Sequence, residues 1–329
     1  MKTPTRLMEK LAAELHADAG DRGRFLSALT SPGNFAPCVL WTGSAGERAD
    51  FDLPSAAPDE RVAWLPDFAR RLAPGTEPGK HPGHAAGAFY SLDFSSVWAA
   101  SAMLAADGSG GRPRRVLDLC AAPGGKSVFA SLALGPALLL SNEVIGKRLA
   151  VLRHNLARCR APNAFTQRLD PRDFAAESER AGRGFFDLVI ADAPCSGQSL
   201  PAKGIENPGA FHPATVKGNA KRQAGILTSA AACVAPGGWL LYATCTFSPR
   251  ENERVVERIL DRCGGGLSAV EVPHLAPWRS RLAEFPCYRL HPDSGLGAGA
   301  FVALLRRAGE PDVTSVAPPP PEVWLAYPV

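Results

Sequence analysis

The sequence predicts a doubly wound α/β domain over residues 86–309, preceded by a small module over residues 1–85 and followed by a proline-rich tail over residues 310–329. Three observations predict this arrangement. Short apolar runs alternate with longer helical patterns through the central region. Glycine, proline and histidine gather between residues 74 and 87, as at a domain boundary. Four consecutive prolines at 318–321 favour a semi-extended appendage that adds nothing to the core.

The N-terminal module opens with a helical pattern, since Leu7, Leu11 and Leu15 recur at helical spacing, and a second apolar segment follows around Phe25. Candidate strands and helices then alternate, which predicts parallel strands joined by helical crossovers. The last strand follows a segment with no helical pattern, so we expect it to pair antiparallel at an edge. The strands are expected at 115–119, 137–142, 164–169, 185–192, 238–244 and 299–306, and the helices at 126–134, 145–158, 215–234 and 249–262.

The composition is that of a globular protein. The chain has 329 residues, of which 21% are charged and 46% hydrophobic, which excludes disorder throughout and a disulfide miniprotein. Lysine and arginine number 36 against 32 acidic residues, and the net charge of +4 permits a polyanionic partner without requiring one. We expect a monomer.

The cysteine pattern indicates a reduced, cytoplasmic protein. None of the eight cysteines falls at a C-x2-4-C spacing, so neither a zinc ribbon nor a redox motif is supported, and we expect no metal. The charged first twenty residues do not resemble a secretory signal. Residues 223–249 carry no charge, but Pro236-Gly237-Gly238 interrupts them, so we interpret them as a buried helix, a turn and a central strand, with no membrane partner.

A glycine turn follows the first strand, in RVLDLCAAPGGKS at 115–127. Ligands of doubly wound sheets bind at this place, where glycines let the backbone approach and a helix offers free N–H groups. A Walker A loop would need glycine at position 120, which is Cys120, and the G-x-G-x-x-G pattern of dinucleotide sites is absent. Glu143 ends the second strand, where an acid suits a ribose diol. The pattern also suits S-adenosylmethionine, and an ordinary turn remains the alternative.

Three blocks make the prediction specific: DLCAAPGGKS at 118–127, DAPCSG at 192–197 and YATCTFSPRENE at 242–253. In sequence, order and spacing they resemble the Sun/Rsm-type (NOP/Sun) family of S-adenosylmethionine-dependent RNA (cytosine-5)-methyltransferases. The resemblance covers about residues 85–307 and the first 80 only loosely. It also includes YSLDFSS at 90–96, NEVIGKR at 142–148 and the segment 288–307.

The resemblance implies a class I, Rossmann-like methyltransferase domain that uses S-adenosylmethionine. It implies RNA as the partner, ribosomal RNA first and transfer RNA second, and an N-terminal module that contacts this RNA. A methyltransferase with a protein or small-molecule substrate is one alternative, and it would not need the two motif cysteines. A non-catalytic RNA-binding or assembly factor on the same fold is another.

The chemistry separately favours cysteines at the ends of adjacent strands. Carbon 5 of cytosine is a poor nucleophile until a thiolate adds to carbon 6. The resemblance assigns this addition to Cys245 and product release to Cys195. Asp192 ends a strand just before Cys195, where a carboxyl group could hold the cytosine through its amino group and ring nitrogen 3, with capping of the following turn as the alternative. The resemblance places Lys126 in the same site, with a solvated lysine at the helix start as the alternative. The remaining cysteines outside the glycine turn are expected to be small buried hydrophobes: Cys38, Cys159, Cys233, Cys263 and Cys287.

The resemblance also implies a cofactor site. Glu143 would hold the ribose, where family members often carry Asp, and Asp170 would lie on the adenine side, with Asp173 as its alternative. The complete set implied for the cofactor is Cys120, Ala121, Ala122, Pro123, Gly124, Gly125, Lys126, Glu143, Arg148, Asp170 and Asp192.

The segment after Cys195 is basic, and it departs from the Arg-rich pattern common in the family. Within residues 198–222, one acid accompanies four basic side chains and two rings. Such a loop is suited to contacting phosphates and stacking on bases, although a solvated loop is the alternative. The residues concerned are Lys203, Phe211, His212, Lys217, Lys221 and Arg222.

Overall fold

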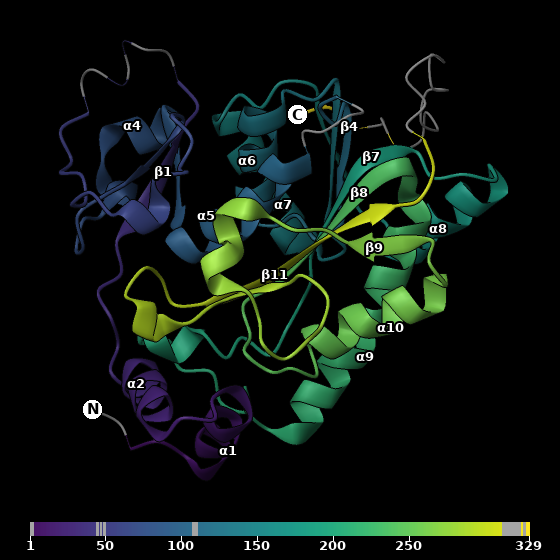
Figure 1. The fold of residues 1–329 in the computed structure, drawn as a ribbon. Helices are drawn as coiled ribbons and strands as arrows, with labels where there is room; N and C mark the ends of the chain where they lie inside the picture. Colours follow the sequence, from purple (N-terminus) through teal and green to yellow (C-terminus); the bar gives the residue numbers. More distant parts are fainter. Residues whose placement is uncertain are drawn as a thin grey trace.

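The structure is a computed structural model that describes residues 3–43, 46, 48, 51–106, 111–310, 324 and 327–329. At the centre of this described part lies an eight-stranded sheet in the order β10-β11-β8-β7-β4-β5-β6, with β9 paired to β11 (Figure 1). Strands β8, β7, β4, β5 and β6 are parallel, and β11 is antiparallel to β8. The strands are β4 (Arg115–Asp118), β5 (Leu138–Asn142), β6 (Ala164–Gln167), β7 (Phe186–Asp192), β8 (Val234–Thr244), β9 (Leu267–Ala269), β10 (Tyr288–Leu290) and β11 (Ala300–Arg307).

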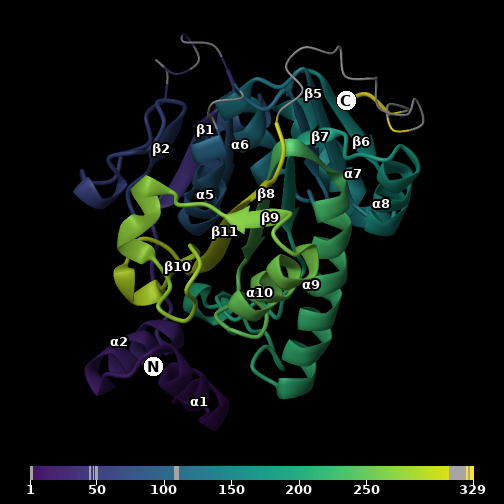
Figure 2. The same cartoon turned by 45° about the vertical axis from the view of Figure 1, so that its right-hand side comes forward.

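Helices cover both faces of the sheet, as the apolar strands require. Successive residues of a strand point to opposite faces of the sheet, and each face has its own hydrophobic core. In β4, for example, Val116 belongs to the first core and Leu117 to the second. The first core contains α5 (Phe94–Ser101), α6 (Gly125–Leu134) and α7 (Gly146–Arg158). The second contains α8 (Pro171–Arg180), α9 (Pro213–Cys233) and α10 (Glu253–Cys263), whose packing along the sheet is visible in Figure 2.

The winding direction reverses between β4 and β7. Helices α6 and α7 carry the chain outward from β4 to β5 and β6, and α8 and α9 then carry it back to β7 and β8 on the other side of β4. The connections that leave the carboxyl ends of β4 and β7 therefore run in opposite directions along the sheet. Such a topological switch point is where doubly wound sheets bind ligands.

The expected doubly wound sheet is confirmed, with its six strands, four helices and antiparallel last strand. The short strands β10 and β9 lie outside β11. The helix and the central strand expected within residues 223–249 are present, as α9 up to Cys233 and β8 from Val234. In place of a separate turn, the expected break at Pro236-Gly237-Gly238 is an irregularity inside β8, where Phe186 pairs with Val234 but Leu188 with Trp239, and Gly237 has φ +70°. No helix of the described residues is long and apolar enough to cross a bilayer.

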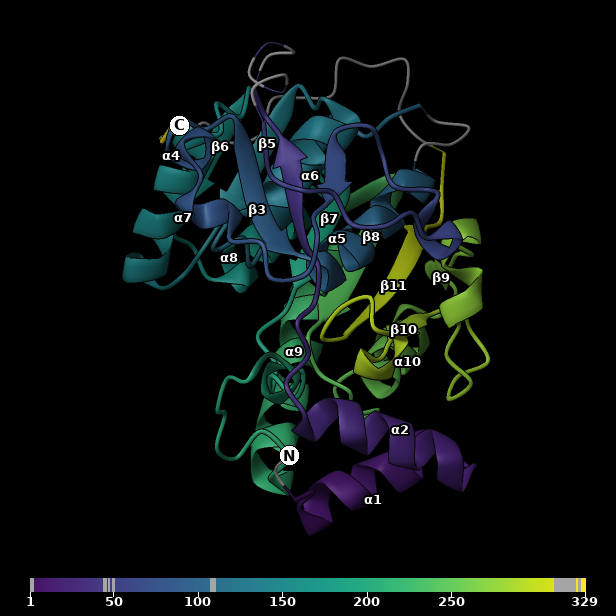
Figure 3. The same cartoon turned by 90° about the vertical axis from the view of Figure 1, so that its left-hand side faces the viewer.

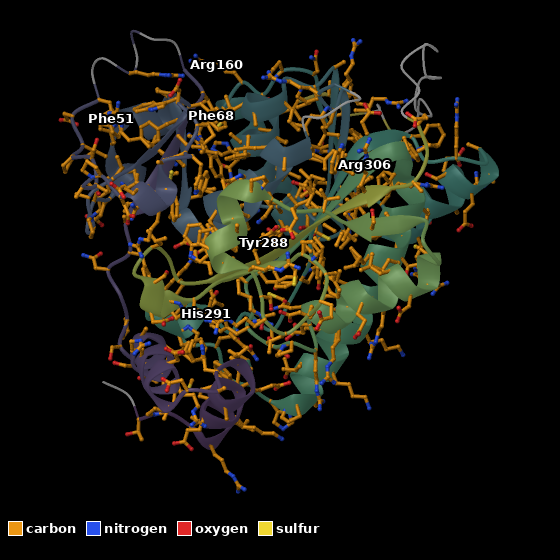
Figure 4. The ribbon with its side chains drawn as sticks, in the orientation of Figure 1. Phe51, Phe68, Arg160, Tyr288, His291 and Arg306 are labelled. Atoms are coloured by element: carbon orange, nitrogen blue, oxygen red, sulfur yellow. The ribbon has the colours of Figure 1, made fainter. Side chains whose placement is uncertain are left out.

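The N-terminal region has two parts (Figure 3). Helices α1 (Arg6–Leu15) and α2 (Ala19–Thr30) form a hairpin, and Thr5 and Asp18 cap them by accepting backbone N–H groups. A separate three-stranded antiparallel sheet follows in the order β2-β1-β3, with β1 at Pro37–Trp41, β2 at Ala69–Arg71 and β3 at Phe89–Asp93. The short helix α4 (Pro82–Ala85) immediately precedes β3. Phe51 packs its ring on this sheet (Figure 4).

The helical hairpin packs through an aromatic cluster against the segments that follow β8 and β10. Phe25 of α2 lies 5.2 Å from Phe247 and 5.4 Å from His291, measured between ring centroids. His16 lies 5.0 Å from His291, whose position above the hairpin is labelled in Figure 4. Phe247 comes shortly after β8, so the hairpin packs directly against the segment that follows a central strand.

The end of the proline-rich tail adds to the core. Trp324 is 2% exposed and stacks at 5.6 Å on Phe186. Beyond it, the backbone N–H of Thr166 in β6 donates to the carbonyl of Tyr327, and Val329 donates to Ala164. The expectation that the tail adds nothing to the core is therefore wrong for Trp324, while prolines 318–321 lie outside the described residues.

Candidate functional site

A pocket of about 380 Å³ lies at the switch point. Three strand ends line it, together with the start of α5 and the loop after β7. This is the position that the topology predicts for a ligand site. The strand-end residues that line it are Cys120, Ala122, Pro123, Asp192, Ala193, Pro194, Cys195, Thr244 and Cys245, with Lys126 of α6 and Arg148 of α7.

The structure brings the two motif cysteines into contact. Strands β7 and β8 are parallel, and Asp192 pairs with Ala243. Cys195 comes three residues after Asp192 and Cys245 two residues after Ala243, and the two Sγ atoms lie 3.2 Å apart. The Cys245 residue is exposed, and Cys195 is half-buried behind it.

The two thiols differ in acidity. A hydrogen bond from Cys195 lowers the pKa of Cys245, and the positive charges of Lys126 and Lys203 lower it further, against burial and the charge of Asp192. The pKa of Cys195 is raised well above its usual value, by the same hydrogen bond and by burial. The two shifts favour the proton on Cys195 and the thiolate form, which is the nucleophilic form of cysteine, on Cys245.

Lys126 and Asp192 form an ion pair beside the cysteines. The Nζ atom of Lys126 donates to Oδ2 of Asp192 at 2.6 Å. The lysine side chain is 8% exposed and the aspartate side chain 39%, so the pair reaches from the protein interior to the pocket. Lys126 lies in the first turn of α6, which the glycine turn directs toward the end of β7.

The glycine turn is shaped for close approach to a ligand. Gly124 precedes α6 with φ +118°, a conformation that other residues rarely adopt. Beneath the turn, Asp118 accepts a 2.7 Å hydrogen bond from Ser127, while its Oδ1 atom is buried without a partner. Burial raises the pKa of Asp118 to about 7.

Glu143, which follows β5, does not line the pocket, and its assignment to the cofactor ribose stays a prediction that its surroundings favour. Its side chain is 3% exposed, and one carboxylate oxygen accepts the N–H of Ile145 at 2.9 Å. The other oxygen, Oε2, is buried and makes no hydrogen bond, although Nη1 of Arg148 lies 3.0 Å away as an ion-pair partner. Arg148 also donates to the carbonyl of Ala122 in the glycine turn at 2.6 Å. A buried acceptor without a donor suits a hydroxyl-bearing ligand.

The two candidate acids after β6 cap a helix. Asp170 accepts the N–H of Arg172 and its guanidinium, and Asp173 accepts the N–H of Asp170 in a reciprocal capping box. The Arg172 interaction lowers the pKa of Asp170. Neither acid lines the pocket, so their assignment to the adenine side stays a prediction.

A buried network that the sequence analysis missed holds the turn after β7. Glu251 accepts the backbone N–H of Ser196 at 2.9 Å, the Ser196 hydroxyl at 2.5 Å and the Gln223 amide at 3.0 Å. Tyr242 donates to the carbonyl of Glu251. Burial raises the pKa of Glu251. Glu251 lies within the third motif block, but no spacing rule links it to Ser196, which is next to Cys195.

A second missed group supports the segment after Cys245. Arg289 of β10 forms a buried ion pair with Glu253 and donates to the carbonyl of Phe247 at 2.8 Å. Ser280 also donates to Glu253, at 2.6 Å. The Phe247 backbone N–H is bound to the Gln198 side chain at 3.0 Å, so both faces of this peptide segment are fixed.

The basic loop divides into two parts. Lys203 lines the pocket and pairs with Asp93 at 3.3 Å. His212 caps α9 by accepting the N–H of Ala214, and Phe211 is half-buried against the hairpin cluster. The other basic residues, Lys217, Lys221 and Arg222, are exposed on α9 outside the pocket.

The remaining cysteines have unreactive surroundings. Cys38, Cys159, Cys233 and Cys287 are buried as expected, whereas Cys263 is half-buried. Burial raises the pKa of all five, and that of Cys120. Among the described residues, no cluster of three or more His, Cys, Asp or Glu side chains is arranged to hold a metal ion.

Known proteins resemble this chain in sequence and in fold. The family model described as 16S rRNA methyltransferase RsmB/F matches residues 111–306. Ribosomal RNA small subunit methyltransferase F of Serratia proteamaculans is 32% identical over 226 residues, which are 68% of this chain and 46% of that protein. The chain thus spans about half the length of the curated relatives it matches.

Two solved structures show the same fold at low sequence identity. PH0851 matches with a TM-score of 0.73 and 21% identity, over 93% of this chain and 69% of that one. NSun6 from Pyrococcus horikoshii, solved with SFG, matches with a TM-score of 0.68 and 17% identity, over 93% and 99% of the two chains. The family match covers the three motif blocks and the strands that carry them, and the chain therefore belongs to the 16S rRNA methyltransferase RsmB/F family.

Proposed function

We propose that this protein transfers a methyl group from S-adenosylmethionine to carbon 5 of a cytosine in RNA, through a covalent adduct with Cys245. The observation that carries the proposal is the contact of the exposed Cys245, whose pKa is lowered, with Cys195, whose pKa is raised, at 3.2 Å beside the Lys126–Asp192 ion pair. A methyltransferase for an already nucleophilic atom would have no use for such a pair.

The residues around the glycine turn fit the cofactor. Glu143 would hold the ribose hydroxyls with Oε2, which is buried without a hydrogen bond beside its ion-pair partner Arg148, and the backbone from Ala121 to Gly125 would hold the amino-acid end. Arg148 fixes the turn through the Ala122 carbonyl. When bound, S-adenosylmethionine supplies an electrophilic methyl group on a sulfonium.

The chain's own residues would then act in sequence. The Cys245 thiolate adds to carbon 6 of the cytosine, which gives carbon 5 the electron density to form its new carbon–carbon bond. Asp192 accepts a hydrogen bond from the amino group of the base and orients the ring, and Lys126 stabilises the charge that develops there. Loss of the carbon 5 proton then breaks the carbon 6–sulfur bond, and Cys195 assists this release.

Ribosomal RNA is the substrate class that the family favours, with transfer RNA second. The exposed basic side chains of α9 lie next to the loop that lines the pocket, and would contact the phosphates of the RNA. The N-terminal module would add a further RNA contact. We propose that the protein acts as a cytoplasmic monomer, without a metal.

The test is methyl transfer to total ribosomal RNA, read by bisulfite sequencing and by gel detection of protein–RNA adducts. We expect the wild type to modify one cytosine, Cys245→Ala to give neither product nor adduct, and Cys195→Ala to accumulate a covalent adduct. Cys263→Ala is the matched control, because this half-buried thiol lies outside the pocket. Product formation by Cys245→Ala would refute the proposal.

A further inference from the structure

The Cys195 and Cys245 thiols are close enough to form a disulfide bond after a small movement. Its Sγ atoms are 3.2 Å apart, so they must approach by only about 1.2 Å to reach the length of a disulfide bond. Side-chain rotation accounts for a movement of this size if the backbones are already at the right separation.

The backbone meets this condition on both sides of the pair. Upstream, Asp192 and Ala243 are partners in parallel strands, and neighbouring strands lie about 4.8 Å apart. Downstream, the hydroxyls of Ser196 and Thr246 are 2.7 Å apart. The two cysteines lie between these fixed points, and a strand spacing of about 4.8 Å falls within the roughly 4.4–6.8 Å between the α-carbons of disulfide-bonded cysteines.

The acidities divide the two thiols into an attacking and a resolving group. Cys245 is exposed with a lowered pKa, and thiolate character with exposure governs reaction with peroxides. Cys195 keeps its proton until its neighbour is oxidised. The other six cysteines all have raised pKa values, so oxidation is directed to this pair.

We propose that Cys195 and Cys245 form a site of reversible oxidation, at which a peroxide converts the contacting thiols into an intramolecular disulfide. The Cys245 thiolate attacks one peroxide oxygen, breaks the O–O bond and becomes a sulfenic acid, releasing hydroxide. The Cys195 sulfur then attacks the Cys245 sulfur, and the departing hydroxide takes the Cys195 proton as water. Two thiols lose two electrons, and one hydrogen peroxide becomes two waters.

The disulfide removes both reactive sulfurs of the pocket at once. A dithiol reductant restores them, whereas an isolated Cys245 would continue to the irreversible sulfinic acid. Cys195 therefore protects Cys245 from permanent loss. This role concerns the thiols alone and holds whatever substrate the pocket takes.

The experiment uses the full chain, hydrogen peroxide and peptide mass spectrometry after alkylation of free thiols. Trypsin releases Cys195 in residues 184–203 and Cys245 in residues 223–250, and chymotrypsin separates Cys245 from Cys233 in the second peptide. We expect a linked pair lighter by two hydrogens, complete loss of alkylation at both cysteines, and full recovery after dithiothreitol. Cys233→Ser, the matched control, should retain the link.

Cys195→Ser separates this proposal from nonspecific oxidation. Without the resolving thiol, Cys245 should stop at the sulfenic acid, which dimedone traps. In excess peroxide without dimedone it should go on to the sulfinic acid, which dithiothreitol does not reduce, so alkylation of Cys245 should not recover. The proposal is overturned if peroxide leaves the wild-type pair fully alkylated, if Cys245 links to another cysteine, or if Cys195→Ser recovers as fully as the wild type.

Discussion

Replacing Arg289 by methionine should destabilise the protein more than the loss of any exposed ion pair. The Arg289 and Glu253 side chains are only 6% and 4% exposed. Removing the guanidinium leaves the Glu253 carboxylate buried with one remaining donor, the Ser280 hydroxyl. Breaking a buried pair from one side costs about 3–5 kcal/mol. The variant also loses the hydrogen bond to the Phe247 carbonyl, which lies close after Cys245.

Urea unfolding at neutral pH, followed by circular dichroism, measures this loss as a shift of the midpoint. Lys80→Met is the matched control, because Lys80 and Glu77 form an ion pair whose side chains are 76% and 64% exposed. We expect that control to cost at most about 1 kcal/mol. The double variant Glu253→Gln with Arg289→Met should recover part of the stability, since no buried charge remains unpaired. Equal midpoints for Arg289→Met and Lys80→Met would refute the reasoning.

Three further predictions concern the pocket and its supports. Asp118 keeps its proton up to about pH 7 when folded and loses it near 3.8 when unfolded, so unfolding releases a proton and stability falls as the pH rises between these values. Asp118→Asn should reduce this fall, measured by urea unfolding at about pH 5 and about pH 8. Lys126→Gln should raise the pH midpoint of Cys245 alkylation by iodoacetamide by about one unit. Gly299→Ala should lower the free energy of unfolding, measured by thermal unfolding, by about 1–3 kcal/mol or more. The φ of Gly299 is +118°, and the new Cβ would lie 2.4 Å from the ring of Phe247.

Matched controls exist for the last two variants. Lys217→Gln removes an exposed charge outside the pocket and should leave the alkylation profile unchanged. Gly225→Ala places a methyl group in open space on α9 and should raise stability slightly. A pH dependence of stability that is unchanged in Asp118→Asn, a common alkylation midpoint for both lysine variants, or equal melting temperatures for the glycine variants would contradict the respective predictions.

The sequence predicts the central sheet because its strands are locally marked. Each buried strand is a short apolar run, and each motif block begins at a strand end, so Cys195 and Cys245 are found without knowledge of the pairing. Helix α8 is missed because its sequence is mostly polar, although Asp170, Pro171 and Asp173 carry its start signal.

Contacts between distant segments account for what the sequence does not predict. Strand β3 pairs with β1 far upstream, and the three strands of that sheet have few residues each. Arg289 reaches Glu253 from a strand of three residues, and Lys203 pairs with Asp93, which lies far upstream in the sequence. Charged residues at such positions are normally solvated, so their burial follows only from the completed fold.

The packing of the helical hairpin has a consequence for the motion of the segment that carries Cys245. Phe25 of α2 packs on Phe247, the same segment that Arg289 and Gln198 fix just after Cys245. When α1 and α2 separate from the body, this segment loses its apolar contact and is held only by the hydrogen bonds from Gln198 and Arg289 among the contacts described above. We therefore expect amide exchange in α2 to correlate with the mobility of the segment that carries Cys245.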